Sequence, residues 1–206
     1  MPSPTDRRAW RLAFLLTANP DAASSLLARL PNAKRDSLEP ALFDRVIIQN
    51  ARSLPHAETI NLPATALSTP SALALATEAL SAAIKLPSQP REAWILKRLD
   101  DLDDLHIARA MDCSKTAAKT HLAAADEALA LRLADRLPSA IAALREYTDS
   151  LDPAPLIAAH LHQRKLHRAK RLKITAGLIA AALILITYIF LKPRQSIAVE
   201  LAKIVV

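Results

Sequence analysis

Apolar residues recur every three or four positions along most of this chain, which is the period of a helix that buries one face. Near the N-terminus the pattern predicts a helix that Asp6 caps and that Asn19-Pro20 ends. Two further helices are expected over residues 22–30 and 38–53. The prolines and Ser/Thr residues of 55–70 are typical of a linker, so these first helices form a group of their own.

The densest helical pattern covers residues 71–130. An apolar stripe runs over residues 91–99, and Asp103 then begins a short helix. The run from Asp112 to Ser114 predicts a turn, and Ser114 is a good N-cap for a helix that continues to about Ala130. We therefore expect two helices joined by a short turn.

Composition supports the same fold class. Hydrophobic residues make up 51% of the chain, mostly alanine and leucine, while aromatic residues are 3% and there is one glycine. A β-sandwich or barrel needs turn glycines and β-branched or aromatic strands, so this composition argues against both. The fourteen prolines then separate helices. The sequence predicts an all-α protein.

One uncharged apolar segment stands out near the C-terminus. Residues 174–191 contain 18 residues without a charge. At about 1.5 Å per residue they span roughly 27 Å, close to the hydrocarbon thickness of a bilayer. Tyr188 and Phe190 lie near one end, where aromatic rings favour the membrane interface. The segment predicts a single transmembrane helix and a lipid bilayer as a partner.

Charge around this segment predicts its orientation. The net charge is +7, and six Lys/Arg residues lie in 164–173, against three after residue 191. Basic residues favour the cytoplasmic side, so the N-terminal part is expected in the cytoplasm, with this basic stretch beside anionic headgroups. Because the excess charge is concentrated there, it is not by itself a sign of nucleic-acid binding. The apolar run 12–18 is too short for a secretory signal.

No constellation for catalysis or metal binding is evident, and we expect neither an enzyme nor a cofactor. His160, His162 and His167 lack the spacing of a compact metal site on a helix. The acids of 100–104 fit a solvated helix junction better than a metal site. The single Cys113 excludes an internal disulfide and is expected to be a small buried side chain.

The segment around the predicted turn has a recognisable order of motifs. Leu86-Pro87, Arg91-Glu92, Ile107-Ala108 and Ser114 follow one another, with further matches at Leu96, Leu99, Leu102, Thr116, Lys119 and Leu122. This order resembles region four of bacterial RNA polymerase sigma factors, most closely the extracytoplasmic-function (ECF) type. The resemblance implies a helix-turn-helix whose second helix enters the major groove of promoter DNA.

The N-terminal helices resemble region two of the same factors. Residues 10–23 are similar to its opening, and residues 38–52 to its later helix. In the family an acid and a glutamine of the second helix hold the core polymerase, but Ser25 and Ala28 stand at those positions here. Of the aromatic residues that melt promoter DNA in the family, this chain offers only Phe43 in the corresponding region.

The resemblance assigns DNA contacts to the first turns of the second helix, at Ser114, Lys115, Thr116, Lys119, Thr120 and His121. Alanines and Asp126 replace the family's later basic residues, which lowers the number of phosphate contacts. Asp101 and Asp112 stand at turn positions where the family favours glycine, and aspartate tolerates the left-handed conformation better than most residues.

These observations predict a membrane-anchored, sigma-factor-like regulator that binds promoter DNA, core RNA polymerase, or both. An alternative is a degenerate sigma-like module that binds a protein regulator at the membrane without DNA, and a third is sequestration of a partner in the manner of an anti-sigma factor. The expected parts are a region-two-like domain, a linker, a region-four-like domain, basic juxtamembrane helices, the transmembrane helix and a short tail, at residues 1–54, 55–70, 71–137, 138–173, 174–191 and 192–206.

Overall fold

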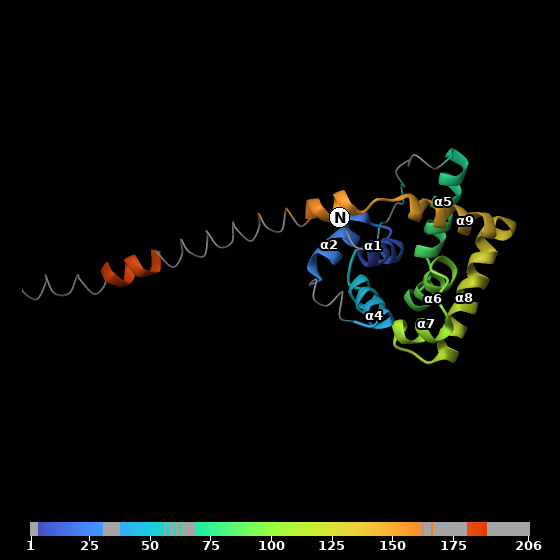
Figure 1. The fold of residues 1–206 in the computed structure, drawn as a ribbon, viewed down its shortest axis with the longest axis horizontal. Helices are drawn as coiled ribbons and strands as arrows, with labels where there is room; N and C mark the ends of the chain where they lie inside the picture. Colours follow the sequence, from blue (N-terminus) through green and yellow to red (C-terminus); the bar gives the residue numbers. More distant parts are fainter. Residues whose placement is uncertain are drawn as a thin grey trace, which may run out of the picture. The chain divides into compact units, whose positions relative to one another are not determined.

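The computed structural model describes residues 4–30, 38–55, 57, 60, 62, 69–160, 162, 166 and 181–188 (Figure 1). Every regular element among these residues is a helix, and no strand occurs among them. The predicted all-α class is confirmed. The chain divides into two units, residues 1–160 and 161–206, and each is described by itself.

Three helices form the N-terminal part of the first unit: α1 (Pro4–Thr17), α2 (Pro20–Arg29) and α4 (Pro40–Ala51). The side chain of Asn19 accepts hydrogen bonds from the backbone N–H groups of Asp21 and Ala22, which caps α2 as its sequence suggests. The buried indole of Trp10 donates to Ser24 Oγ over 2.9 Å and so ties α1 to α2. The three predicted N-terminal helices are present.

Two long helices pack against each other in the second part of this unit, α5 (Pro70–Ile84) and α9 (Leu137–Ser150) (Figure 1). Thr69 caps α5 by accepting a hydrogen bond from the Ala72 N–H. Tyr147 of α9 is buried, and burial raises the pKa of its phenol to about 12. A break at residues 151–153 separates α9 from a helical segment at 154–160.

The residues that connect α5 to α9 in the sequence contain the predicted turn. Its elements are α6 (Ser88–Trp94), the π-helical turn η1 (Ile95–Leu99), α7 (Asp104–Met111), α8 (Lys115–Leu133) and the 3-10 turn η2 (Ala134–Arg136). Every apolar residue of the stripe over 91–99 is buried. The helix after Ser114 ends at Leu133, three residues later than expected.

One apolar core runs through residues 1–160. It joins Trp10 and Ile47 of the N-terminal helices to Trp94, Leu129 and Leu144 of the later ones. In Figure 1 helix α7 lies beside α4, and the two helices make extensive contacts. The N-terminal helices and the segment α6–α8 therefore share an interface, and this interface sets the position of α7 and of the turn that follows it.

In the second unit the structure describes residues 162, 166 and 181–188, all of them helical, with exposed leucine and isoleucine side chains at 166 and 183–186. Among the described residues, no helix combines the length and the apolar character needed to cross a membrane. Of the predicted transmembrane span 174–191, only residues 181–188 are described. Residues 174–180 and 189–191 and the whole tail 192–206 lie outside the described residues.

Candidate functional site

The predicted helix, turn and helix follow one another in the structure as α7, residues 112–114 and α8. Asp103 caps α7: its Oδ1 accepts hydrogen bonds from the N–H groups of Leu105 at 2.8 Å and His106 at 2.9 Å. The bond from the His106 N–H and, to a smaller extent, the bond from the Leu105 N–H lower the pKa of the Asp103 carboxyl. The cap fixes the start of α7 at the residue that the sequence indicates.

The turn is built from backbone geometry. Asp112 adopts the left-handed conformation, with φ 58° and ψ 48°, and the Cys113 N–H donates to the Ala108 carbonyl over 3.0 Å. Ser114 Oγ then accepts a hydrogen bond from the Ala117 N–H at 3.1 Å and caps α8. Asp101, the other aspartate expected at a glycine-like position, also has positive φ, at 51°. Both expectations for the turn aspartates are confirmed.

The residues predicted to contact DNA lie together at the start of α8. Ser114, Lys115, Thr116, Lys119 and Thr120 are exposed, whereas His121 is half-buried. Lys119 Nζ lies 3.4 Å from Asp104 Oδ2, so part of its charge is neutralised within the protein. The exposed surface of this end of α8 is therefore basic and hydroxyl-rich, with Lys115 and Lys119 as its cations.

A charge cluster around two buried carboxylates, which the sequence did not predict, joins α1 and α4 to α7 and to the residue that follows η1. It consists of Arg8, Arg11, Asp44, Asp100 and His106. Arg8 donates two hydrogen bonds to the Asp44 carboxylate, at 2.8 and 2.7 Å, and His106 Nε2 lies 2.7 Å from the same carboxylate. Burial opposes the charge of Arg8, but the bond to Asp44 and the charges of Asp44 and Asp100 outweigh it and raise its pKa.

Asp100 corrects one interpretation of the sequence. Residues 100–104 were expected as a solvated helix junction, but the Asp100 side chain is 1% exposed and is bonded to Arg11. Burial raises the pKa of the Asp100 carboxyl, although the charges of Arg11 and Arg8 act in the opposite direction. The prediction is wrong for Asp100 because the partners come from α1, about ninety positions earlier in the chain.

The Arg91-Glu92 motif has a structural part in this packing. Both residues are buried, and Glu92 accepts two hydrogen bonds from Arg52 at the end of α4, at 2.7 and 2.6 Å. The positions compared with the family's polymerase contacts differ in exposure: Ser25 is half-buried and Ala28 is buried. The two bonds from Arg52 to the Glu92 carboxylate therefore join the end of α4 to α6.

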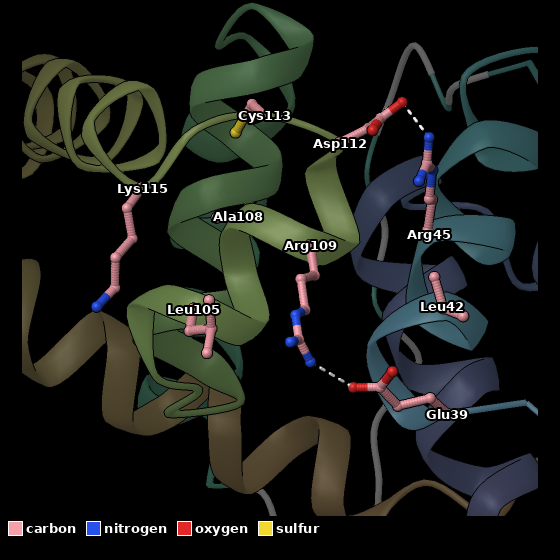
Figure 2. A pocket seen from close by; sticks show the side chains of 9 residues that line it. All are labelled: Glu39, Leu42, Arg45, Leu105, Ala108, Arg109, Asp112, Cys113 and Lys115. Carbon is pink, nitrogen blue, oxygen red and sulfur yellow. Dashed lines mark hydrogen bonds and ion pairs between the residues drawn. The ribbon is translucent and has the colours of Figure 1, made fainter.

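A groove opens between α4 and one face of α7, extending to the first residue of α8, with a volume of about 420 Å³ (Figure 2). We call it the α4–α7 groove, and its principal lining residues are Glu39, Leu42, Arg45, Leu105, Arg109 and Lys115. Two ion pairs cross it from α7 or the turn to α4: Arg109 with Glu39 over 2.7 Å, and Asp112 with Arg45. Lys115 belongs both to this groove and to the predicted DNA surface.

The remaining candidates for site chemistry are metal ligands and the single thiol. No group of three or more His, Cys, Asp or Glu residues there is arranged to hold a metal ion. Cys113 is half-buried rather than buried, and burial, followed by the charges of Asp112 and Glu92, raises the pKa of its thiol. A raised thiol pKa lowers the fraction of reactive thiolate at neutral pH.

Comparisons with protein-family models and with curated proteins give no match to this chain.

Proposed function

We propose that this chain is a membrane-anchored, sigma-factor-like transcription regulator that binds promoter DNA through the first turns of α8. The observation that carries the proposal is the exposure of Ser114, Lys115, Thr116, Lys119 and Thr120 at the start of a capped, 19-residue helix. The positive end of the helix dipole adds to the two lysines and favours phosphate at this end of α8. The hydroxyls supply further donors to the DNA backbone.

The membrane anchor of the proposal rests on residues 174–191, which carry no charge. The described part of that segment, residues 181–188, is helical and exposes four consecutive large apolar side chains at 183–186. Lipid is the medium that would cover such side chains. The basic stretch 164–173 supports a location of the preceding residues on the cytoplasmic side of a bacterial membrane.

Core RNA polymerase is the weaker partner in this proposal. Ala28 has neither a carboxylate nor an amide and is buried, and Ser25 is half-buried. The proposal therefore makes DNA the first target and leaves polymerase as a partner to be tested beside it. No catalytic role is included in it.

The test measures binding of the full chain, in detergent micelles, to a pool of random duplexes at several salt concentrations. Lys115→Ala and Lys119→Ala are each expected to weaken binding and to reduce the slope of log K against log salt by about 0.9. Lys85→Ala is the matched control, because Lys85 is an exposed lysine at the end of α5. The proposal is contradicted if the parent chain shows no salt-sensitive DNA binding at low salt. It is also contradicted if the three variants have the same affinity and the same salt dependence.

A second candidate is an interaction module without DNA binding. It is favoured by the pairing of Lys119 with Asp104, which withdraws charge from the predicted DNA surface, and by the ion pairs that α7 and its turn form with residues of α4 and its N-cap. A folded full chain that binds neither duplex DNA nor core polymerase at low salt would support this candidate over the first.

A further inference from the structure

Exposed leucines gather at the α4–α7 groove. In the described part of residues 1–160, three large apolar side chains are exposed: Leu42 at 40%, Leu105 at 50% and Leu131 at 82%. Two of these three line this one groove, from different helices. Single exposed leucines are ordinary, but two of them from different helices that line one groove offer a ligand two separate apolar contacts.

The charges of the groove are unequal. Arg45, Arg109 and Lys115 supply three cations, and Glu39 and Asp112 supply two carboxylates that pair with the arginines. Lys115 forms no ion pair with another side chain in the described part of the chain, although its charge helps to lower the pKa of Asp103. An acidic group on a ligand therefore finds its counterpart at Lys115.

These properties favour protein over nucleic acid as the occupant. A sugar-phosphate backbone gains little from two leucines, and the two carboxylates repel it. Both walls are helices whose backbone groups bond within the helix, so the groove offers no sheet edge to an extended peptide. An amphipathic helix that inserts apolar side chains fits such walls.

The arrangement in Figure 2 indicates how such a helix binds. Leu105 and Lys115 lie on one side of the Arg109 side chain, and Leu42 lies on the other. Arg109 and Glu39 are themselves exposed, and an exposed pair contributes little net stability, so a ligand can displace Glu39 at small cost. A ligand helix with one apolar side chain on each side of Arg109 contacts both Leu42 and Leu105, and an acidic side chain on the same helix pairs with Lys115.

We propose that the α4–α7 groove binds an amphipathic helix of a protein partner, with two large apolar side chains on Leu42 and Leu105 and a carboxylate at Lys115. The inference does not depend on DNA binding, although Lys115 is common to both surfaces. Since one lysine cannot serve a phosphate and a carboxylate at once, occupation of the groove weakens any DNA binding through Lys115.

The experiment uses the full chain in detergent micelles and a display library of random peptides of roughly 16 residues, long enough for about four helical turns. Enriched peptides are expected to carry two large apolar residues three or four positions apart and a nearby Asp or Glu. Leu42→Asp and Leu105→Asp are each expected to weaken their binding by about tenfold or more, because a buried leucine contact is lost. Leu131→Asp, at an exposed leucine outside the groove, is the matched control.

The acidic contact has its own test. Lys115→Glu is expected to lower the affinity for peptides that carry the acidic residue. Peptides in which Asn or Gln replaces that residue should bind the parent and the variant with similar affinity. Circular dichroism checks that each variant keeps its helix content. Where a Leu→Asp variant loses it, the Leu→Ser variant at the same position is used instead. Peptides that bind the leucine variants as tightly as the parent, or a library without enrichment, overturn the proposal.

Two other occupants are distinguished by the same variants. If Leu105→Asp weakens binding to the duplex pool as much as Lys115→Ala does, the groove is a nucleic-acid surface and the proposal fails. If Leu42→Asp abolishes a dimer of the full chain in light scattering, a second copy fills the groove and the proposal fails as well. Unchanged DNA binding and an unchanged mass support the peptide helix.

Discussion

The charge cluster and the α4–α7 groove both lie where α7 and its neighbouring loops meet the N-terminal helices, and both contain ion pairs between these parts. In the cluster, the Asp44 and Asp100 side chains are each 1% exposed. In the groove, Glu39 is 52% and Asp112 60% exposed. Both sets pair arginines with carboxylates, and the difference in the exposure of the carboxylates decides what each set of pairs can do.

A buried pair and an exposed pair respond differently to the loss of one partner. A carboxylate without water needs its cation, so removing the cation leaves an uncompensated charge. An exposed carboxylate regains water instead, and its pair contributes little. The cluster is therefore suited to holding α1 and α4 on the later helices, whereas the groove pairs can exchange partners without disturbing the fold.

The largest effect is expected at Arg8. Arg8→Met removes the cation that bonds Asp44 and lies 3.8 Å from Asp100, and it should lower the free energy of unfolding by about 3–5 kcal/mol. Arg136→Met is the control, since Arg136 pairs with Glu78 at the surface, and about 0–1 kcal/mol is expected there. Urea titration of the full chain, followed by helical circular dichroism, measures both. Similar losses in the two variants would contradict the comparison.

The next effect concerns the turn at Asp112, which combines a left-handed backbone with an exposed ion pair. Asp112→Ala and Asp112→Gly both remove the pair with Arg45, so their difference reports the backbone. The glycine variant should be more stable by about 1 kcal/mol, because alanine is disfavoured at positive φ.

A helical aspartate provides the control for that experiment. Asp126 lies inside α8, where glycine is less favourable than alanine by about 1 kcal/mol, so the order of the two variants should reverse. Thermal or urea unfolding of the four variants gives both differences. The same order at both positions would rule out the left-handed backbone as the cause.

Local features of this chain could be predicted from its sequence. The caps at Asp103 and Ser114 and the break at Asn19-Pro20 each follow from one residue and its neighbours, whereas the left-handed Asp112 is indicated by the resemblance, which places glycine at that position. Their physical causes act within a few positions of the chain, where propensity and capping decide. The all-α class followed in the same way from helical periodicity and composition.

The cluster and the groove could not be predicted in this way. Asp44 meets His106 across 62 positions, and Arg52 meets Glu92 across 40. A charged residue at a helix junction is expected to be solvated unless its distant partner is known, which is why the prediction for Asp100 is wrong. Leu42 and Leu105 are likewise unremarkable in their own helices and acquire meaning only where α4 and α7 meet.

Asp100 gives the cluster a pH dependence with a definite sign. Burial raises the pKa of its carboxyl above the ordinary value of 3.8, so the folded state holds this proton more tightly than the unfolded state. The stabilisation from this group is present below that value and is lost as pH rises through the raised pKa. The unfolding free energy of the parent minus that of Asp100→Asn should therefore fall from about pH 3 to about pH 7.

Asp149→Asn is the control for this measurement, because Asp149 pairs with the same Arg11 but its side chain is 63% exposed. Its difference from the parent should change less over the same pH range. A difference for Asp100→Asn that rises with pH would mean that the attraction of Arg11 and Arg8 exceeds the cost of burial, and the cluster would then stabilise the charged form.

The smallest effect is expected at the groove itself. Arg109→Met removes the exposed pair with Glu39 and should cost about 0–1 kcal/mol at low salt. In about 1 M salt, where charges are screened within roughly 3 Å, even this cost should disappear. The loss in Arg8→Met should persist under the same conditions, because buried pairs are screened much less. Urea titrations at the two salt concentrations compare them, and a cost at Arg109 that survives high salt would show that the groove pairs hold the fold and are not free to exchange with a ligand.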